Sequence, residues 1–469
     1  MGGFNNSCPS VEKVEAPVSK LKGRNDTRDD KPHASRHRTL RAVENSVSLS
    51  SNLELTYRGD CLSSPRRTPM KQTREILRDA TTGRVASAAR FLMATFVMTA
   101  SFVMVLTGSA GASGPPPVNV TVSQSGLHIF SINGRHFGVT TQIHVLTFNG
   151  SQYSIAIGLA HDALDGGIQT PSAMCQNTPG CVAAVNADFF DLTPPNVSDP
   201  GDEVGGIIQN CVLLHSPEIS HQQANLDGHS VGNGLNWSST LSVNGASVPI
   251  TAINQELPLS YSTISLPLTG TLLYSAPYAL DIPSAGGRTT YEFTQVGGTA
   301  SPTTINTTAQ LSYVGQTTQP VRVGAGGVDI SAPAGTALTS LEPGETVTLT
   351  TTSTAGCDNI GGHPILINQG VVAPIAPADT YMVKPYARTL IGWTGTGVTV
   401  LMTVDGKDAV SGATAFQLDH LVESLGVVTA LDLDGGNSTT FFAEGRVLNK
   451  PSRGTEHPVS TGLLVIATP

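Results

Sequence analysis

Alternating apolar and polar residues mark the first regular stretch of the chain. Between residues 118 and 160 the alternation runs through four segments, VNVTVSQ, HIFSI, TQIHVLTF and QYSIAIGL. A period of two places apolar side chains on one face of a strand and polar side chains on the other. The pattern therefore predicts half-buried β-strands over this region.

The stretch from about residue 235 to 355 continues in the same manner. Its runs STLSV, SVPITAI, GTLLYS, AQLSYV and ETVTLTT are separated by Gly, Pro and Asn-Gly turn signals. These strands either belong to the same domain or form a separate immunoglobulin-like or adhesin module. The composition of the stretch is compatible with both.

One helix interrupts the strand pattern. Thr414 can cap its first turn, Gln417 completes a capping-box pattern, and Gly426 supplies a C-terminal stop. The apolar stripe between them consists of Leu418, Leu421, Val422 and Leu425. The predicted fold class is therefore α+β: a single, largely antiparallel, β-rich domain with a few helices, preceded by a disordered leader and a signal segment.

The residues before this domain have a different character. Residues 1–69 are polar, lack a periodic pattern and are rich in Ser, Arg and Asp, which predicts a disordered leader that need not belong to the mature protein. Residues 70–112 are interpreted as a signal peptide or a membrane anchor. Residues 113–469 then form the folded domain.

An apolar run within residues 70–112 carries the export prediction. The run covers residues 91–107 without a charge, and small residues at Ala110 and Ala112 fit a signal-peptidase site. About 17 residues is at the short edge of what spans a bilayer. Cleavage and export are therefore favoured over a retained anchor, and membrane contact is expected only in passing, through the signal segment.

The charges of the chain are distributed unevenly. Residues 1–112 hold 17 of the 26 Lys and Arg but only 10 of the 35 Asp and Glu. The remaining 9 basic and 25 acidic groups leave residues 113–469 with a net charge of -16. This balance excludes a nucleic-acid partner read over a broad basic face, because such binding needs many Lys and Arg contacts.

The cysteines of the predicted domain are even in number. Cys175 and Cys181 enclose a five-residue turn that can bring them together, which leaves Cys211 and Cys357 as a long-range pair. A zinc site is disfavoured because no CxxC or CxxH spacing is present. Free thiols remain the alternative.

The segment after the predicted helix carries the most informative chemistry. The apolar run VVTALDL predicts a strand, and its alternation places Asp432 and Asp434 on one face. Gly435 and Gly436 follow at once and allow a ligand to approach backbone amides closely. Two hydroxyl residues, Ser438 and Thr439, can then donate hydrogen bonds to an anionic oxygen. The alternative is an ordinary hairpin with an Asp-Gly-Gly turn.

A second strand end has the same character. The run VAAV leads into Asn186, Asp188, Phe189 and Phe190, and Gly205-Gly206 follows after an acidic, Pro-rich loop. Amides and carboxylates beside two aromatic rings are typical of a sugar-binding pocket. Equally, the two Phe side chains can belong to the core and Asp188 to a solvated turn.

Seven segments in one order resemble the phosphodiester glycosidase family, which includes the enzyme that uncovers mannose 6-phosphate by removing N-acetylglucosamine. They are GCVAAVNADFFD, GDEVGGIIQN, GGHPILINQG, ARTLIGWTGTGVTVLMTVDGK, LVESLG, ALDLDGGNSTTFF and VLNKPSRGTEHPVSTGLLV. The resemblance covers roughly residues 120–468, so it assigns the Thr-rich middle to the same domain. It implies hydrolysis of a sugar 1-phosphodiester to the sugar and a phosphomonoester.

The resemblance also implies site residues. Those that match family positions are Asn186, Arg388, Asp434 and Glu456, which we predict to be catalytic. Asp188 and Asn437 stand where glycine is common, Asp432 where Asn is frequent, His457 where the family has arginine and Thr461 where it usually has asparagine. With His457 in place of arginine, the second positive charge of the site depends on pH.

The chemistry of these residue types agrees with the implied reaction. Arg388 can hold two phosphate oxygens with its fork of donors, or it can form a buried ion pair with one of the many carboxylates. Asp434 can act as base, nucleophile or metal ligand with Glu456 as its acidic partner. The predicted substrate-binding set is Gly435, Gly436, Ser438, Thr439, Arg453, His457, Lys384, Gly205 and Gly206. No cofactor is required, although Asp188, Asp432 and Asp434 offer hard oxygen ligands for Ca²⁺ or Mg²⁺.

Three function classes follow from the sequence. The preferred one is a secreted or cell-surface hydrolase whose partner is a phosphorylated glycan or another sugar-phosphodiester substrate of the cell envelope or extracellular space. The second is a non-catalytic glycan-binding surface protein on the same fold. A purely structural β-rich surface protein is the third, and the ordered motifs disfavour it.

Overall fold

A computed structural model describes residues 118–468 apart from 125, 192–200, 218–220, 256–269, 283–286, 299, 376–378 and 408–409. The predictions of a disordered leader and of a signal segment lie outside these residues. Residues 99–469 form one compact unit. Within the described part the unit is rich in strands and has few helices, which confirms the predicted β-rich domain.

The largest sheet brings the first predicted strands together with the segments that carry the site. Its neighbouring strands are all antiparallel. Among the described residues it has eight strands in the order β1 (Val118–Gln124), β2 (Leu127–Asn133), β3 (Gln142–Phe148), β23 (Thr399–Val404), β22 (Arg388–Thr394), β24 (Val427–Asp432), β20 (Ile365–Asn368) and β21 (Val371–Val372).

A second sheet packs against one face of the first. Leu146, Ile391 and Leu431 from the first sheet share an apolar core with Ile157 and Leu463 from the second. The second sheet has the order β26 (Arg446–Val447), β25 (Phe441–Ala443), β5 (Cys181–Asn186), β27 (Thr461–Ala467) and β4 (Tyr153–Leu159). Helix α1 (Pro171–Asn177) contacts β4, β5 and β27 of this sheet.

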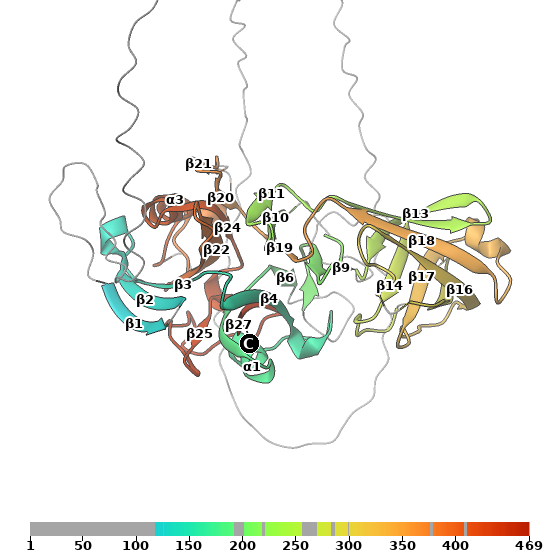
Figure 1. The fold of residues 1–469 in the computed structure, drawn as a ribbon, viewed down its shortest axis with the longest axis horizontal. Helices are drawn as coiled ribbons and strands as arrows, with labels where there is room; N and C mark the ends of the chain where they lie inside the picture. Colours follow the sequence, from blue (N-terminus) through green and yellow to red (C-terminus); the bar gives the residue numbers. More distant parts are fainter. Residues whose placement is uncertain are drawn as a thin grey trace, which may run out of the picture. The chain divides into compact units, whose positions relative to one another are not determined.

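The predicted helix covers the opposite face of the first sheet. It is α3 (Ala415–Ser424), with both hydrogen bonds of the capping box present and Gly426 in the left-handed region at φ 72°. Leu418, Leu421 and Val422 pack against Leu390 and Ala430 of the sheet. Ala430 of β24 therefore packs on the α3 side and Leu431 on the side of the second sheet. Figure 1 shows α3 beside β20, β22 and β24.

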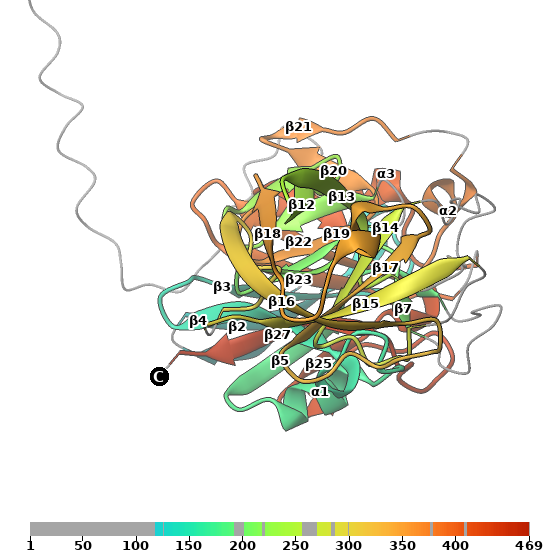
Figure 2. The same ribbon diagram turned by 90° about the vertical axis from the view of Figure 1, so that its right-hand side faces the viewer.

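The Thr-rich middle of the chain forms a closed barrel, whose strands face the viewer in Figure 2. All neighbouring strands are antiparallel except β13 and β14. The barrel order is β12 (Trp237–Val243), β13 (Ala246–Ile253), β14 (Thr271–Ser275), β17 (Gly327–Pro333), β15 (Arg288–Gln295), β16 (Thr307–Thr317) and β18 (Thr346–Ser353).

The barrel is inserted between two strands that pair with each other. β10 (Gln222–Asn225) and β19 (Asn359–Gly362) are neighbours in a small sheet, with β11 (Ser230–Gly232), β8 (Ile207–Gln209) and β9 (Val212–His215). Ile208 and Leu213 of this sheet belong to the apolar core of the barrel. The middle is therefore part of the same compact unit and not a separate module.

Short elements complete the described structure. β6 (Phe190–Asp191) pairs with β7 (Asp202–Glu203), and the remaining helical turns are η1 (Gly134–Phe137), η2 (Ala160–Asp162), η3 (Ala337–Ser340), η4 (Gly436–Ser438) and α2 (Thr380–Val383). Cys175 is bonded to Cys181 and Cys211 to Cys357, as predicted. No helix in the described ranges is long and apolar enough to cross a membrane.

Candidate active site

The Asp-Gly-Gly segment carries the chain from the first sheet to the second. It follows β24 and leads through η4 into β25, and these two strands lie in different sheets. The hairpin alternative is therefore wrong. A Cβ atom at Gly435 would collide with the Tyr381 hydroxyl and the Ala387 carbonyl, and Gly436 has φ 59°. Both positions require glycine.

Asn186 joins the two sheets at this crossing. It lies at the end of β5 and is fully buried. Its side-chain NH₂ donates to the Asp434 carbonyl at 2.6 Å, and its Oδ1 accepts from the Thr389 hydroxyl at 2.7 Å and the Thr440 N–H at 3.1 Å. Asn186, which we predicted to be catalytic, thus positions the Asp434 backbone.

Asp434 is the partly exposed carboxylate of the site. Its backbone N–H donates to Ala187, and its Oδ1 accepts from the Gly435 N–H at 2.8 Å. Desolvation raises the pKa of Asp434 to about 7, while hydrogen bonds from Ser438 and Gly435 oppose the shift and the charge of Asp188 adds to it. This carboxylate can therefore exchange a proton near neutral pH.

Arg388 and Asp432 form a buried ion pair on neighbouring strands. Arg388 Nη1 lies 3.1 Å from Asp432 Oδ2, and both side chains are fully buried. Burial raises the pKa of Asp432, and the Arg388 guanidinium opposes that shift. Asp432 lies two residues after Ala430 in β24, so both lie on the face of the sheet that packs against α3.

The guanidinium of Arg388 has all its donors occupied. Nε donates to the Ala413 carbonyl, Nη1 to Asp432 and weakly to Met382 Sδ, and Nη2 to the carbonyls of Tyr381 and Lys384. A guanidinium has five N–H groups, so no fork is left for a phosphate. This geometry leaves no donor of Arg388 for the predicted direct contact with phosphate. Arg388 instead holds the side chains of Asp432 and Tyr381 in place.

Tyr381 presents an unsatisfied hydroxyl beside the Asp-Gly-Gly turn. The Arg388 guanidinium lies 4.4 Å from the centre of its ring, and its hydroxyl is buried without a hydrogen-bond partner within the structure described. Desolvation, and next the charge of Asp434, raise the pKa of Tyr381 well above its ordinary value. The phenol therefore stays neutral and can donate a hydrogen bond to a bound oxygen.

Asp188 fills a niche between two glycines. A Cβ atom at Gly205 or Gly361 would collide with its Oδ2, and that oxygen has no hydrogen-bond partner in the part described. Its Oδ1 accepts from the Phe189 N–H at 2.7 Å and lies 3.8 Å from His221 Nδ1. Asp188 is thus buried, and the expectation of a solvated turn residue is wrong.

Two histidines that the sequence analysis missed lie beside Asp188. The His221 and His363 rings stack with centres 5.9 Å apart. His363 Nδ1 lies 2.6 Å from Gln222 Oε1, and its Nε2 lies 2.9 Å from Asp379 Oδ2. The segment GGHPILINQG contained His363, but nothing local to it indicated these partners.

The His363–Asp379 pair and Asp188 differ in their exposure to solvent. Desolvation alone would raise the pKa of Asp379, but hydrogen bonds from His363 and from two backbone N–H groups lower it below its ordinary value. The side chains of His363 and Asp379 are 35% and 27% exposed, whereas Asp188 is closed to solvent. The His363–Asp379 pair can therefore meet a ligand and Asp188 cannot do so directly.

Further buried groups support this region from behind. Desolvation and then the charge of Asp188 raise the pKa of Glu203 well above its ordinary value. Desolvation also lowers the pKa of His215 to about 4, and its Nδ1 lies 2.8 Å from the Gly205 carbonyl. His215 is therefore neutral at pH 7, and burial disfavours the charged form of Glu203.

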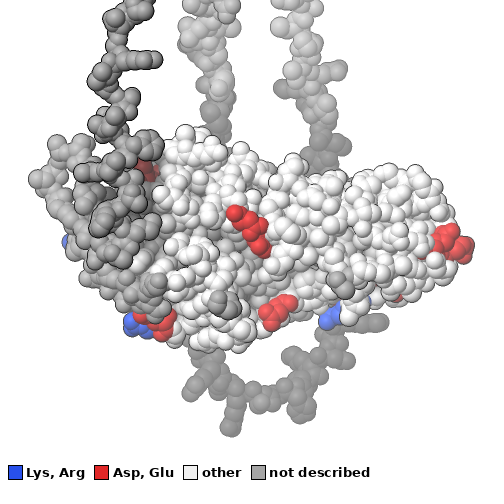
Figure 3. Space-filling view, viewed as in Figure 1, with Lys and Arg blue, Asp and Glu red and all other residues white. Residues whose placement is uncertain are grey.

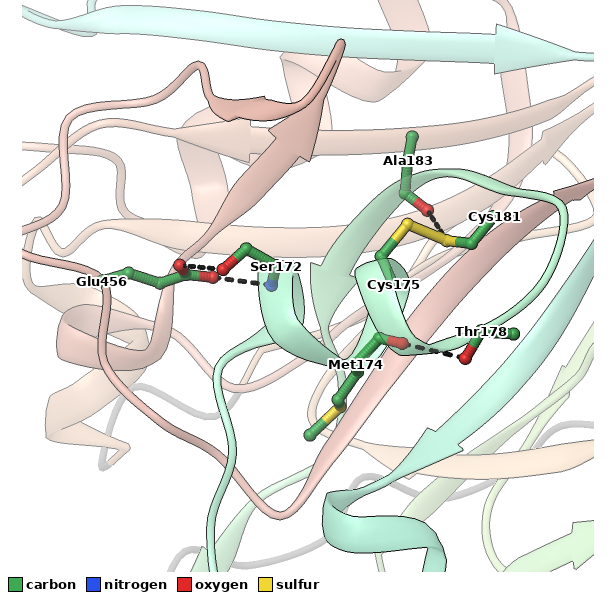
Figure 4. The surroundings of a disulfide bond; sticks show 7 residues. All are labelled: Ser172, Met174, Cys175, Thr178, Cys181, Ala183 and Glu456. Atoms are coloured by element: carbon green, nitrogen blue, oxygen red, sulfur yellow. Dashed lines mark hydrogen bonds between the residues drawn. A yellow bond between two sulfur atoms is a disulfide. The ribbon is translucent and has the colours of Figure 1, made fainter.

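Glu456 is held at the start of α1 (Figure 4). Its Oε1 accepts from the Ser172 N–H at 2.8 Å, and its Oε2 accepts from the Ser172 hydroxyl. A carboxylate at a helix N-terminus satisfies backbone donors that the helix itself leaves open. Glu456 therefore anchors the loop after β26 to α1, and its predicted pairing with Asp434 is not among the contacts described.

The predicted substrate-binding residues divide into two groups. Lys384 and Arg453 are exposed and His457 is half-buried, with its Nδ1 donating to the Pro458 carbonyl at 2.6 Å. Ser438 and Thr439 are buried at the turn, and Ser438 bonds Asp434. Gly205 and Gly206 are buried behind Asp188.

The predicted cation set does not come together. Asp432 is engaged by Arg388, and in the described ranges no group of three or more His, Cys, Asp or Glu side chains is arranged to hold a metal ion. A requirement for Ca²⁺ or Mg²⁺ stays a prediction.

Three comparisons show which known proteins this chain resembles. Residues 298–466 match the phosphodiester glycosidase family model, from inside the barrel to the last strand. An 81-residue stretch is 37% identical to the SPbeta prophage-derived uncharacterized protein YomE of Bacillus subtilis (strain 168), and it covers 17% of this chain and 13% of that protein.

Two solved structures share the fold. A hypothetical protein from Synechocystis superposes with a TM-score of 0.58 at 19% identity, covering 76% of this chain and 64% of that one. A Burkholderia pseudomallei K96243 protein described as exported gives 0.53 at 17% identity, covering 70% and 74%. The chain thus spans under two thirds of the Synechocystis protein, and the likeness concerns the fold alone.

Proposed function

We propose that this chain, whose residues 298–466 match the phosphodiester glycosidase family model, hydrolyses a sugar 1-phosphodiester. The products are the free sugar and a phosphomonoester. The substrate class is an N-acetylglucosamine 1-phosphodiester or a similar linkage on a glycan of the cell envelope or extracellular space.

The observation that carries the proposal is the pairing of groups at the Asp-Gly-Gly turn. Asp434 is partly exposed and has a pKa of about 7, and the unsatisfied Tyr381 hydroxyl faces the adjacent Gly435. A carboxylate that exchanges a proton near pH 7 beside a neutral donor suits general acid–base chemistry.

The chemistry of the leaving group determines the roles. A phosphomonoester has a second pKa of about 6, so it leaves an anomeric carbon without a strong acid. The difficult step is to deliver water and to stabilise the developing sugar cation. Asp434 acts as the general base for that water, and Tyr381 donates to a non-bridging phosphate oxygen.

Positive charge for the phosphate comes from exposed groups. Lys384 and Arg453 are exposed. Arg388 contributes indirectly, because its contacts to Asp432 and to the Tyr381 ring hold that side of the site in place. It is a positioning residue in this scheme.

Export is part of the proposal. Two disulfides are typical of proteins in oxidising compartments, and a solved structure with this fold is described as that of an exported protein. The signal segment predicted within residues 70–112 supplies the route.

The test is hydrolysis of an N-acetylglucosamine 1-phosphodiester in ¹⁸O-labelled water. We expect turnover with the label in the sugar, because water attacks the anomeric carbon. Label in the phosphate would contradict attack at carbon and the role given to Asp434. Absence of turnover of this and of chromogenic sugar 1-phosphodiesters would contradict the proposed activity itself.

A glycan-binding protein without turnover is the second candidate. It is favoured by the occupation of Arg388 and Glu456, two residues predicted to be catalytic, by internal partners. Binding on a glycan array by a folded protein that leaves every diester intact would select this candidate.

A further inference from the structure

A separate cavity of about 490 Å³ lies at the start of β3. Its lining comes from three parts of the chain: residues between 133 and 142 around η1, residues 405–407 and 411 after β23, and residues 450–452. We call it the basic pocket. None of the residues predicted from the sequence to be catalytic or substrate-binding lines it.

The basic pocket concentrates the scarce cations of the domain. Arg135, Lys407 and Lys450 line it and are exposed, and they are three of only nine Lys and Arg in residues 113–469. On the face drawn in Figure 3, Lys and Arg are few and scattered. Three cations on one cavity of an acidic protein attract an anion that the rest of the surface repels.

The carboxylate that lines the pocket is engaged by other groups. Asp405 is buried, and its Oδ1 accepts from the Lys450 N–H at 2.9 Å and lies 3.4 Å from His144 Nε2. Its backbone carbonyl accepts from the Thr141 hydroxyl at 2.6 Å. Asp405 thus ties the three lining stretches together, and its Oδ1 is engaged by the Lys450 N–H.

The rest of the lining suits a sugar. Asn133, Thr140, Gln142 and Ser411 add amide and hydroxyl groups to the wall, which can bind sugar hydroxyls. Small-molecule pockets typically enclose roughly 300–1,000 Å³, so the cavity has room for a phosphorylated monosaccharide unit.

The pocket borders the candidate active site without sharing its residues. Ser452 Oγ lies 2.8 Å from the Gly436 carbonyl and 2.9 Å from the Gly406 carbonyl. One wall of the pocket is therefore in direct contact with the Asp-Gly-Gly turn. A single glycan could therefore have one sugar unit in the pocket and its scissile linkage at Asp434.

We propose that the basic pocket binds a phosphorylated sugar unit of the substrate glycan, with Lys407, Lys450 and Arg135 around the phosphate. The choice of phosphate rests on the proposed function. The cation cluster and the cavity do not depend on it.

Binding of N-acetylglucosamine 6-phosphate, measured by titration calorimetry, tests the proposal, with unphosphorylated N-acetylglucosamine as the neutral probe. The variant Lys407→Ala/Lys450→Ala removes two charges from the pocket. Its matched control, Arg322→Ala/Arg446→Ala, removes two charges from exposed side chains paired with Asp281 and Glu444. Both double variants therefore have the same net charge.

We expect the phosphorylated probe to bind the wild-type protein and the control alike. The pocket variant should bind it about tenfold or more weakly, because charge-assisted hydrogen bonds to phosphate are lost. Equal weakening in both variants would show attraction to net charge alone and overturn the proposal. So would undetectable binding by the wild type, or equal binding of the neutral sugar.

A second readout separates this proposal from the proposed activity. On a small chromogenic sugar 1-phosphodiester the pocket variant should retain wild-type turnover, whereas KM for a phosphorylated glycan should rise about tenfold. Pocket binding without any hydrolysis would contradict the activity only. Hydrolysis with the same KM in variant and wild type would contradict the pocket only.

Discussion

At the scale of single residues, the site depends on the environment of one carboxylate. Asp434 is flanked by Gly435 N–H, by Ser438 and by the charge of Asp188, and desolvation raises its pKa to about 7. A base with this pKa is ready to accept a proton near neutral pH. The more deeply buried Asp432 is instead committed to Arg388.

The pH dependence of turnover follows from this pKa. Below pH 7 Asp434 is protonated and cannot accept a proton, so log kcat/KM should rise with unit slope and level off above about pH 7. Asp434→Asn should lower kcat about 10²- to 10⁴-fold and abolish this limb. A wild-type profile that falls as pH rises through 7 would show that the protonated form is the active one.

The hydroxyl of Tyr381 provides a second residue-scale prediction. Because it is buried without a partner beside Gly435, Tyr381→Phe should reduce kcat about a hundredfold with an unchanged melting temperature. Tyr386→Phe is the matched control, since it removes the hydroxyl of a ring whose centre lies 4.7 Å from that of Tyr381. Equal losses in both variants would show that the effect is not specific to the Tyr381 hydroxyl and would contradict its hydrogen bond to substrate.

At the scale of elements, the crossing from β24 to β25 determines where the site is. Two sheets meet there, and the side-chain NH₂ of Asn186, at the end of β5, donates to the Asp434 carbonyl in the crossing segment. Helix α2 brings Tyr381 to the same place, and Asp379 caps that helix by accepting from the Tyr381 and Met382 N–H groups. The site is thus built at element ends, where backbone groups are open for bonding.

The contact between Glu456 and α1 leads to a prediction about stability. Glu456→Ala and Ser172→Ala should each lower the free energy of unfolding by about 1 kcal/mol, because both remove the bond between the Ser172 hydroxyl and Glu456, and Glu456→Ala also removes the acceptor of the Ser172 N–H. Urea denaturation of both and of the double variant measures their coupling. If the anchoring is correct, the double variant loses little more than either single variant, whereas additive losses would contradict it.

At the scale of the whole molecule, raised carboxyl pKa values link stability to pH. Desolvation raises the pKa of Asp329, Asp419 and Asp434 to about 7 each. These groups therefore bind protons more tightly in the folded than in the unfolded protein. Their stabilising contribution is complete below their unfolded values near pH 4 and is lost as pH rises to about 7.

The melting temperature should accordingly fall between pH 5 and pH 8, as scanning calorimetry at constant ionic strength can measure. Asp379, whose pKa is lowered, acts in the opposite sense but only at more acidic pH. A melting temperature that rises steadily from pH 5 to pH 8 would contradict the burial of these carboxylates.

The two disulfides should differ in their contribution to stability. Cys211 and Cys357 are 146 residues apart and flank the barrel in the sequence, whereas Cys175 and Cys181 are 6 apart. Loop-closure entropy predicts about 5 kcal/mol for the long loop and about 2 kcal/mol for the short one. Paired Cys→Ser variants compared by denaturant unfolding test this order, and a larger loss for the short loop would reverse it.

Local patterns in the sequence determined the elements of this protein. The period-two runs before residue 160 are β1 to β4, and Thr414 and Gln417 alone identified the start of α3. The Cys pairs were also correct. Such features depend on neighbouring residues, on spacing or on simple counting, so a single sequence contains them.

Only the tertiary structure decided which polar groups face one another. Arg388 looked available for phosphate, yet the register of β22 against β24 places it on Asp432, and four other residues take its remaining donors. The meeting of Asp188 with His221 and the closeness of the buried Tyr381 hydroxyl to Gly435 depend equally on sheet order. Periodicity gives the face of a strand on which a side chain lies, but its partner comes from a strand far away in the sequence, and packing alone selects that strand.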